Sequence, residues 1–211
     1  MRALGISDYA DYYRRVRDDP SQAELVQLLD AISTNVTSFY RESRHFDILS
    51  DLLAAWERDG QKRFRIWSAA CSTGEEPFTI AMTVLSTLNA AADAKILATD
   101  ISTRVLEIAR QGEYPAKRME DVPPSMRTRH FEKCGSGANA RYRVRESLKS
   151  RIRFARLNLA TPPFPMRGPL DVIFCRNVMI YFDNDVRKRL LDELYRLLKP
   201  GGYLMVGHAE S

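Results

Sequence analysis

The sequence lacks the features of membrane-spanning, secreted and metal-binding proteins. Its 211 residues contain no apolar run near the roughly 18 residues that a membrane-spanning helix needs. Ser7 and Asp8 directly follow a short apolar start, so we expect no signal peptide. The three cysteines show no C-x-x-C spacing and the three histidines are scattered, which argues against a metal site. We therefore expect a cytoplasmic protein with reduced thiols, no bound metal and no part embedded in a membrane.

Two common catalytic signatures are also missing. No Ser-His-Asp or Cys-His constellation is recognisable, which argues against nucleophilic catalysis by the protein itself. The first turn between a predicted strand and helix lacks the G-x-G-x-x-G fingerprint of dinucleotide-binding proteins. The net charge of +5 indicates either an ordinary solvated surface or attraction to an acidic partner. Because no nucleic-acid-binding motif accompanies this charge, we expect no nucleic-acid partner.

Apolar patterning divides the chain into a helical segment, residues 1–58, and an alternating segment, residues 59–211. The helical period dominates residues 7–57, with Ser7 and Ser21 as the expected N-caps. In the second segment strands and helices alternate, which is typical of an α/β fold with a doubly wound, mostly parallel sheet. The expected strands are 64–70, 96–99, 170–174 and 203–206, and the expected helices are 76–88, 103–110 and 185–198.

The alternation fails between Gly112 and Leu157. Residues 141–145 alternate basic and apolar side chains with the period of a strand, so we expect a small antiparallel β insertion at about 113–153. This strand is expected to lie at an edge of the insertion, and the favoured interpretation is that its arginines keep that edge soluble. The alternative is that the free edge binds a peptide as an added strand, with Arg143 or Arg145 contacting its acidic side chains.

A strand, a glycine turn and a helix start follow one another between Arg65 and Met82. Glu75 and Glu76 place two carboxylates at this turn. For Glu75 we favour contact with a positively charged ligand, whereas stabilisation of the helix dipole suits Glu76. Asp100 follows the second strand, where an acid commonly accepts hydrogen bonds from ribose hydroxyls; the alternative is that it caps the next helix.

Other candidate residues follow the later strands. Asn158 lies where the chain should return to the sheet, and it can bond an adenine edge while Leu159 packs on the adenine face; an Asx turn is the alternative for Asn158. Cys175, Arg176 and Asn177 end the third predicted strand and face the same crevice, with a structural ion pair as the alternative for Arg176. The carboxyl ends of parallel strands form the usual nucleoside site of such sheets.

Five blocks carry a family resemblance: NVTSFYR (35–41), ATDIS (98–102), LNL (157–159), DVIFCRNVMIYFD (171–183) and LLKPGGYLMVGHAES (197–211). In this order and at these separations they resemble the CheR-type chemotaxis receptor methyltransferases, from about Ala31 to the last residue. The resemblance implies a Rossmann-like class I S-adenosylmethionine-dependent methyltransferase sheet, an N-terminal helical segment and a small β-subdomain. In that family the helical segment usually begins earlier, so we expect it to be incomplete here.

The resemblance also implies further site residues. Asn35, Thr37 and Arg41 match residues that line the cofactor pocket, although Asn35 or Thr37 can simply cap the following helix. Arg41 is expected to reach the site of methyl transfer, and Tyr181 is expected to border it. Pattern alone makes Tyr181 a core aromatic. Arg41 and Tyr181 are therefore the expected catalytic residues.

The expected function is S-adenosylmethionine-dependent methylation of glutamate side chains on methyl-accepting chemotaxis proteins, with S-adenosylhomocysteine as the product. The expected partners are the cytoplasmic helices of the receptor, with a C-terminal peptide of the receptor as a further candidate. Arg14, Arg15 and Arg17 either steer the receptor by their charge or form an ordinary solvated face, and the sequence leaves both interpretations open. We expect a monomer. Two alternatives stay open: methylation of a small molecule or RNA, and a non-catalytic module that binds the cofactor or its product and signals by contact.

Overall fold

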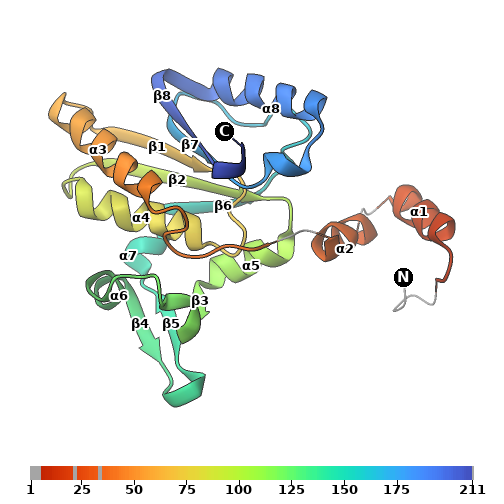
Figure 1. The fold of residues 1–211 in the computed structure, drawn as a ribbon, viewed down its shortest axis with the longest axis horizontal. Coiled ribbons are helices and arrows are strands. Elements are labelled where there is room, and N and C mark those ends of the chain that lie inside the picture. Colours follow the sequence, from red (N-terminus) through yellow and green to blue (C-terminus); the bar gives the residue numbers. More distant parts are fainter. Residues whose placement is uncertain (1–5, 21–22, 33–34, 211) are drawn as a thin grey trace.

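A five-stranded parallel sheet forms the centre of the structure, a computed structural model that describes residues 6–20, 23–32 and 35–210 (Figure 1). The strands lie in the order β6-β2-β1-β7-β8. Every neighbouring pair runs parallel, so the carboxyl ends of all five strands meet at one edge. This arrangement confirms the expected doubly wound α/β sheet. The strands are β1 (Arg63–Ser68), β2 (Asp93–Asp100), β6 (Ile152–Arg156), β7 (Leu170–Cys175) and β8 (Leu198–Val206).

Helices cover both faces of the sheet because alternate strand residues point to opposite sides. Ile66 of β1 joins an apolar cluster with residues of α3 (Arg44–Arg58) and α4 (Glu75–Thr87). The next residue, Trp67, joins a second cluster with α8 (Asn184–Leu197). Burying each large apolar side chain contributes about 1.5–3 kcal/mol, so these two clusters hold the sheet between its helical layers.

An additional antiparallel sheet lies between α5 (Thr103–Gln111) and β6, below the central sheet in Figure 1. The ring of Tyr114 is buried against Phe39 and Phe78, with centroid distances of 5.0 and 6.2 Å, which ties this insertion to the main core. Its elements are β3 (Glu113–Pro115), η2 (Ala116–Met119), α6 (Pro124–His130), β4 (Phe131–Cys134), η3 (Gly137–Asn139), β5 (Arg141–Val144) and α7 (Glu146–Lys149).

Two expectations for this region are wrong. The strand order β3-β5-β4 places β5 in the middle, paired on both sides, so residues 141–144 offer no free edge. Residues 152–153 belong to β6, which pairs with β2 in the central sheet instead of the insertion. Patterning did not predict β6, because it is an edge strand without a fully buried residue and Arg153 and Arg156 interrupt its apolar residues.

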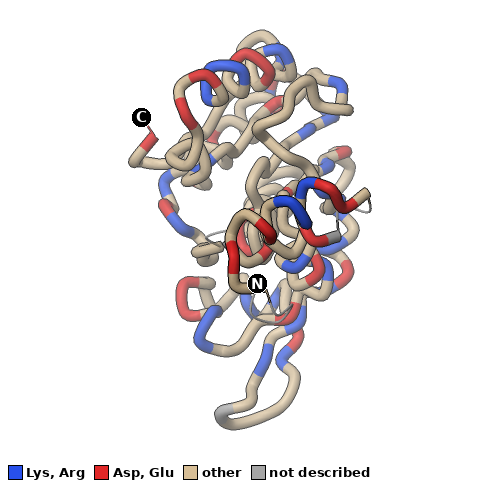
Figure 2. Tube along the Cα trace, turned by 90° about the vertical axis from the view of Figure 1, so that its right-hand side faces the viewer, with Lys and Arg blue, Asp and Glu red and all other residues tan. Residues whose placement is uncertain are grey.

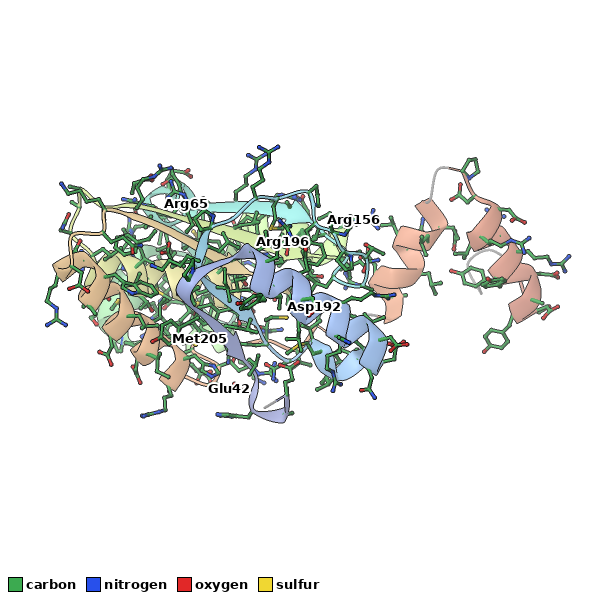
Figure 3. All side chains as sticks on the ribbon, turned by 90° about the horizontal axis from the view of Figure 1, so that it is seen from above. Glu42, Arg65, Arg156, Asp192, Arg196 and Met205 are labelled. Atoms are coloured by element: carbon green, nitrogen blue, oxygen red, sulfur yellow. The ribbon has the colours of Figure 1, made fainter. Side chains whose placement is uncertain are left out.

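The first two helices, α1 (Tyr9–Asp18) and α2 (Ala23–Ile32), stand clear of the sheet (Figure 1, Figure 3). Helix α1 buries none of its residues. Its N-cap is Asp8, whose side chain accepts the backbone N–H of Ala10, so the expected Ser7 cap is wrong. The expected Ser21 cap lies outside the described residues. In the described ranges, no helix combines the length and the apolar character that crossing a membrane requires.

Candidate active site

A cavity of about 570 Å³ opens at the carboxyl edge of the central sheet. The direction in which the chain adds strands changes there, because β2 and β6 lie on one side of β1 and the later strands β7 and β8 lie on the other. Open parallel sheets bind ligands at such a switch point, and small-molecule pockets commonly measure about 300–1,000 Å³. The lining side chains come from segment 35–41, from the first turn of α4, and from the ends of β1, β2, β6 and β7 with the loops that follow them: Asn35, Val36, Thr37, Ser38, Arg41, Ala69, Ala70, Ser72, Glu76, Asp100, Ile101, Leu157, Asn158, Leu159, Ala160, Arg176, Asn177, Val178, Tyr181 and Phe182.

Asp100 is held at one side of the cavity by backbone groups. Its Oδ2 accepts the N–H of Ser72 at 2.8 Å, and its Oδ1 accepts the N–H of Ser102 at 3.0 Å. Burial raises the pKa of Asp100, and these backbone hydrogen bonds oppose the rise. The hydroxyl of Ser102 accepts the N–H of Val105 and caps α5, so Asp100 is not the helix cap. Its carboxylate is therefore fixed in orientation beside the cavity.

The turn after β1 requires glycine at position 74. Gly74 has φ +98°, and a Cβ there would lie 2.9 Å from both the Cβ of Ala109 and the hydroxyl of Tyr114. That hydroxyl donates to the carbonyl of Thr73 at 2.7 Å. The insertion thus helps to fix the turn that begins α4, because only glycine allows this close approach.

The two adjacent glutamates of α4 have different surroundings. Glu76 lines the cavity, and its carboxylate accepts from the hydroxyl of Ser68 at 2.7 Å and from Arg176 at 3.0 Å. Glu75 is not among the lining residues; its side chain is 1% exposed and pairs with Arg118 at 3.1 Å. Burial raises the pKa of both carboxyl groups. The ligand contact of Glu75 stays a prediction, and Glu76 is the glutamate that borders the cavity.

Arg176 connects three parts of the site. Its side chain is only 2% exposed. Besides Glu76, it pairs with Glu42 at 3.2 Å and donates to the backbone carbonyl of Arg41 at 2.6 Å. Arg176 therefore forms the structural ion pair that was the alternative interpretation of the sequence, and it also lines the cavity. By bonding the Arg41 carbonyl, Arg176 positions the segment that carries a predicted catalytic side chain.

Comparison with known proteins assigns the family. Residues 35–211 match the family model described as CheR methyltransferase, SAM binding domain. This protein belongs to the CheR methyltransferase family. Chemotaxis protein methyltransferase 2 of Pseudomonas aeruginosa is 42% identical over 213 residues, which cover 100% of this chain and 75% of that protein. The chemotaxis protein methyltransferase of Escherichia coli is 40% identical over 212 residues, with 100% and 73% covered.

The structural comparison found more distant similarities. A TehB-like SAM-dependent methyltransferase from Corynebacterium glutamicum aligns with a TM-score of 0.41 at 14% sequence identity. The alignment covers 94% of this chain and 73% of that structure. The family assignment rests on the sequence comparisons alone.

The side chains that line the cavity of this CheR-family protein are chemically suited to bind S-adenosylmethionine. Asp100 accepts one backbone hydrogen bond at each oxygen, which leaves lone pairs for ribose hydroxyls. Ile101 and Leu159 provide apolar surface for an adenine ring. The carboxylate of Glu76 supplies negative charge for an ammonium or sulfonium group. The fit rests on these donor and acceptor types, together with the volume of the cavity.

Arg41 and Tyr181 both reach the cavity from short segments outside the sheet. The guanidinium of Arg41 donates to the carbonyl of Val36 at 2.8 Å, which folds its side chain back over segment 35–41. Tyr181 ends the short helix η4 (Met179–Tyr181) and is 59% exposed, so it is not a core aromatic. Asn35 and Thr37 line the cavity from the same segment as Arg41. The structure thus brings the two predicted catalytic side chains to one cavity.

The remaining predicted residues divide into lining and supporting positions. Asn158, Leu159 and Asn177 line the cavity, and Asn158 also forms the Asx turn, because its Oδ1 accepts the N–H of Ala160 at 3.0 Å. Cys175 is fully buried in the second core cluster and is not a lining residue. Burial raises the pKa of its thiol, which therefore stays protonated and unreactive.

Left-handed backbone conformations gather at this site. Among the described residues other than glycine, those with positive φ are Tyr40, Glu42, Ser72 and Asn177, with φ between 47° and 57°. Ser72 and Asn177 line the cavity, and Tyr40 and Glu42 flank Arg41. Such conformations cost about 1–3 kcal/mol and persist where surrounding contacts hold them, commonly at functional sites.

Sequence reasoning missed several residues that support the cavity. Arg118 comes from the insertion and donates to the carbonyl of Thr37 at 2.8 Å, besides its pair with Glu75. Glu42 and Glu210 contact the segments that carry Arg41 and Tyr181, as described below. No spacing signal could have found these residues, because their partners lie tens of residues away in the chain.

Proposed function

We propose that this protein transfers the methyl group of S-adenosylmethionine to glutamate side-chain carboxylates of a methyl-accepting chemotaxis protein. The observation that supports this most is the joint presence of Arg41, Tyr181 and Asp100 around one cavity, in a member of the CheR family. In this proposal Asp100, Asn158 and Leu159 hold the adenosine part. Tyr181 stands exposed at the opening, where a glutamate on a receptor helix can approach.

The reaction needs alignment more than proton transfer. When bound, S-adenosylmethionine would supply a methyl group on a positively charged sulfur. In-line attack of a carboxylate oxygen on the methyl carbon forms the methyl ester, and the sulfur leaves as the thioether of S-adenosylhomocysteine. A free glutamate has a pKa near ~4.3, so the acceptor is already ionised at neutral pH and no general base is required. The task of the protein is to hold the oxygen in line with the methyl group at roughly 3 Å.

Arg41 and Tyr181 are the residues that we assign to this alignment. Arg41 is always charged and can orient a carboxylate, and the bond from Arg176 to its carbonyl fixes its backbone. The guanidinium donates one N–H to the carbonyl of Val36, and we assign its remaining N–H groups to a positioning contact with the acceptor carboxylate. The hydroxyl of Tyr181 donates a hydrogen bond to the second carboxylate oxygen.

Methyl transfer to receptor-containing membranes tests the proposal. With tritiated S-adenosylmethionine, we expect label on the receptor that mild base releases as methanol, because methyl esters are base-labile. Arg41→Ala serves as the inactive comparison. Binding of S-adenosylhomocysteine without any transfer would favour the non-catalytic signalling module, and base-stable label on another acceptor would favour the other methyltransferase alternative.

We further propose that α1 steers the receptor through its arginines. Arg14 pairs with Asp11 and Arg17 pairs with Asp18, so the acidic neighbours offset part of the positive charge. Figure 2 shows Lys and Arg interspersed with Asp and Glu along the chain. Reversing the charge of Arg14, Arg15 and Arg17 should raise the receptor KM at low salt and leave cofactor affinity unchanged.

The matched control for this experiment lies on α8. Reversal of the exposed residues Lys188 and Arg189 also removes positive charge and should change neither value. A salt dependence of the receptor KM that is the same in the α1 variant and the wild type would exclude α1 as the docking element.

A C-terminal peptide of the receptor is the second proposed docking partner. Because β5 is central, added backbone pairing must use an outer edge of this sheet, and we assign it to β4 because the other edge strand, β3, is shorter and ends in Pro115. Titration with the peptide should therefore shift the amide signals of residues 131–134 and leave residues 141–144 nearly unchanged. We also propose that the protein is a cytoplasmic monomer, and light scattering of the purified protein tests its oligomeric state.

A further inference from the structure

The carboxylate of Glu210 is surrounded by backbone N–H groups of two separate segments. Glu210 belongs to the short helix η5 (His208–Glu210) that follows β8. Its Oε1 accepts the N–H groups of Val178 at 2.7 Å and Met179 at 2.6 Å. Its Oε2 accepts the N–H groups of Asn177 at 2.7 Å and Gly207 at 2.9 Å. One side chain therefore satisfies four backbone donors.

Three of these donors belong to the loop that forms one wall of the cavity. Residues 177–179 follow β7 and begin η4, and the left-handed Asn177, with φ +57°, turns their successive N–H groups toward one point. Such a concave set of N–H groups binds an anion. The same loop continues to Tyr181 and Phe182, which line the cavity. The position of the wall therefore depends on the anion that occupies the concave site.

The neighbouring residues are adapted to this contact. A Cβ at Gly207 would lie 2.9 Å from Glu210 Oε2 and 2.6 Å from Asn177 Nδ2, so only glycine allows the turn to approach the loop. The amide of Asn177 also donates to Glu42 at 3.3 Å, and Glu42 follows Arg41 directly. Figure 3 shows Glu42 beside the C-terminal end of the ribbon. The loop of Tyr181 and the segment of Arg41 are thus linked through Asn177.

We propose that Glu210 is a positioning residue for methyl transfer, which acts by holding the 177–181 loop so that Tyr181 lies against the methyl-transfer site. This inference rests on the proposed function. Glu210 itself is not a lining residue of the cavity. A carboxylate is suited to the role because it only accepts hydrogen bonds and offers about four acceptor positions, which matches the four N–H groups. Its charge also strengthens each bond.

Glu210→Gln provides the sharpest test, because it keeps the shape and replaces one oxygen by an NH₂ group that cannot accept. That group must face two of the four donors, so the loop should shift. A misplacement near 1 Å can lower turnover on the order of 100-fold, and we expect kcat on the receptor to fall about 10- to 100-fold. The Kd of S-adenosylhomocysteine and the receptor KM should stay within about threefold, since the adenosine side of the cavity is untouched.

Two further variants separate positioning from general stability. Glu210→Asp keeps the charge and draws it back by one methylene, so its kcat should lie between those of the wild type and Glu210→Gln. Asp192→Asn removes a similar charge from the exposed face of α8 and should leave all values unchanged (Figure 3). Amide proton shifts of residues 177–179 should move in Glu210→Gln and not in Asp192→Asn.

Several outcomes would overturn the proposal. Wild-type kcat in Glu210→Gln excludes a positioning role. Loss of folding in both Glu210 variants, or a parallel loss of S-adenosylhomocysteine binding and kcat, makes the residue a purely structural one. If the wild-type protein transfers no methyl group to the receptor, the proposed function fails first, and unshifted amides of residues 177–179 in Glu210→Gln then refute the contact to the loop separately.

Discussion

The substitution Asp100→Asn should weaken cofactor binding and protein stability by two separable amounts. In the free protein, the carboxylate accepts the N–H groups of Ser72 and Ser102. The amide of the variant turns its NH₂ group toward one of these donors, and a hydrogen bond to a charged acceptor contributes about 1.5–3 kcal/mol. The free energy of unfolding should therefore fall by about 1–3 kcal/mol, measured by urea denaturation without ligand.

The loss of cofactor affinity comes only from the bonds made to the ligand. Loss of a charge-assisted ribose contact should weaken S-adenosylhomocysteine binding by about 1–3 kcal/mol, which is about 5- to 150-fold in Kd, measured by calorimetry. Ser102→Ala is the matched control: it removes the cap that the Ser102 hydroxyl gives to Val105, at a cost of about 1 kcal/mol of stability, but the residue does not line the cavity. Its Kd should equal that of the wild type. A Kd for the Asp100 variant within about twofold of the wild type would remove Asp100 from the ligand site.

Three further predictions concern catalysis, acid stability and the insertion. Arg41→Ala and Tyr181→Phe should each lower receptor kcat more than they raise the Kd of S-adenosylhomocysteine, and full activity of Tyr181→Phe would show that its hydroxyl has no role. Burial lowers the pKa of the His45 imidazole, so the folded protein binds a proton at His45 less readily than the unfolded chain does. The free energy of unfolding therefore keeps its full value above the unfolded pKa of about 6.5 and decreases as the pH falls toward the folded pKa. His45→Gln should flatten that acid dependence in urea titrations at several pH values, and an unchanged slope contradicts the assignment. Arg118→Met removes the ion-pair partner of the buried Glu75 carboxylate and the bond to the Thr37 carbonyl that holds segment 35–41. Because the Arg118 side chain is 46% exposed, we expect the free energy of unfolding to fall by only about 1 kcal/mol, and we expect the Kd of S-adenosylhomocysteine to rise several-fold. An unchanged Kd would show that the insertion does not influence the cavity.

The sequence by itself predicted the sheet and the edge at which the cavity lies. Period-two apolar runs followed by helical runs leave few topologies, and the carboxyl ends of parallel strands must meet at one edge. Residues at or just after strand ends, such as Asp100 and Asn177, therefore line one cavity, as the sequence predicted. Their roles in binding and catalysis stay predictions. The family blocks are long and ordered, which is why the family could also be identified from the sequence.

Only the tertiary structure shows which of two adjacent residues borders the cavity and which distant segments contact each other. Adjacent helix residues point about 100° apart, and in the folded protein Glu76 borders the cavity whereas Glu75 pairs with Arg118 of the insertion. β6 escaped patterning because an edge strand buries too little surface to need an apolar run. Arg176 and Glu210 acquired their partners across 135 and 33 residues of sequence separation. Those contacts depend on how the helices and the insertion pack on the sheet, and the residues next to Arg176 and Glu210 in the sequence do not determine that packing.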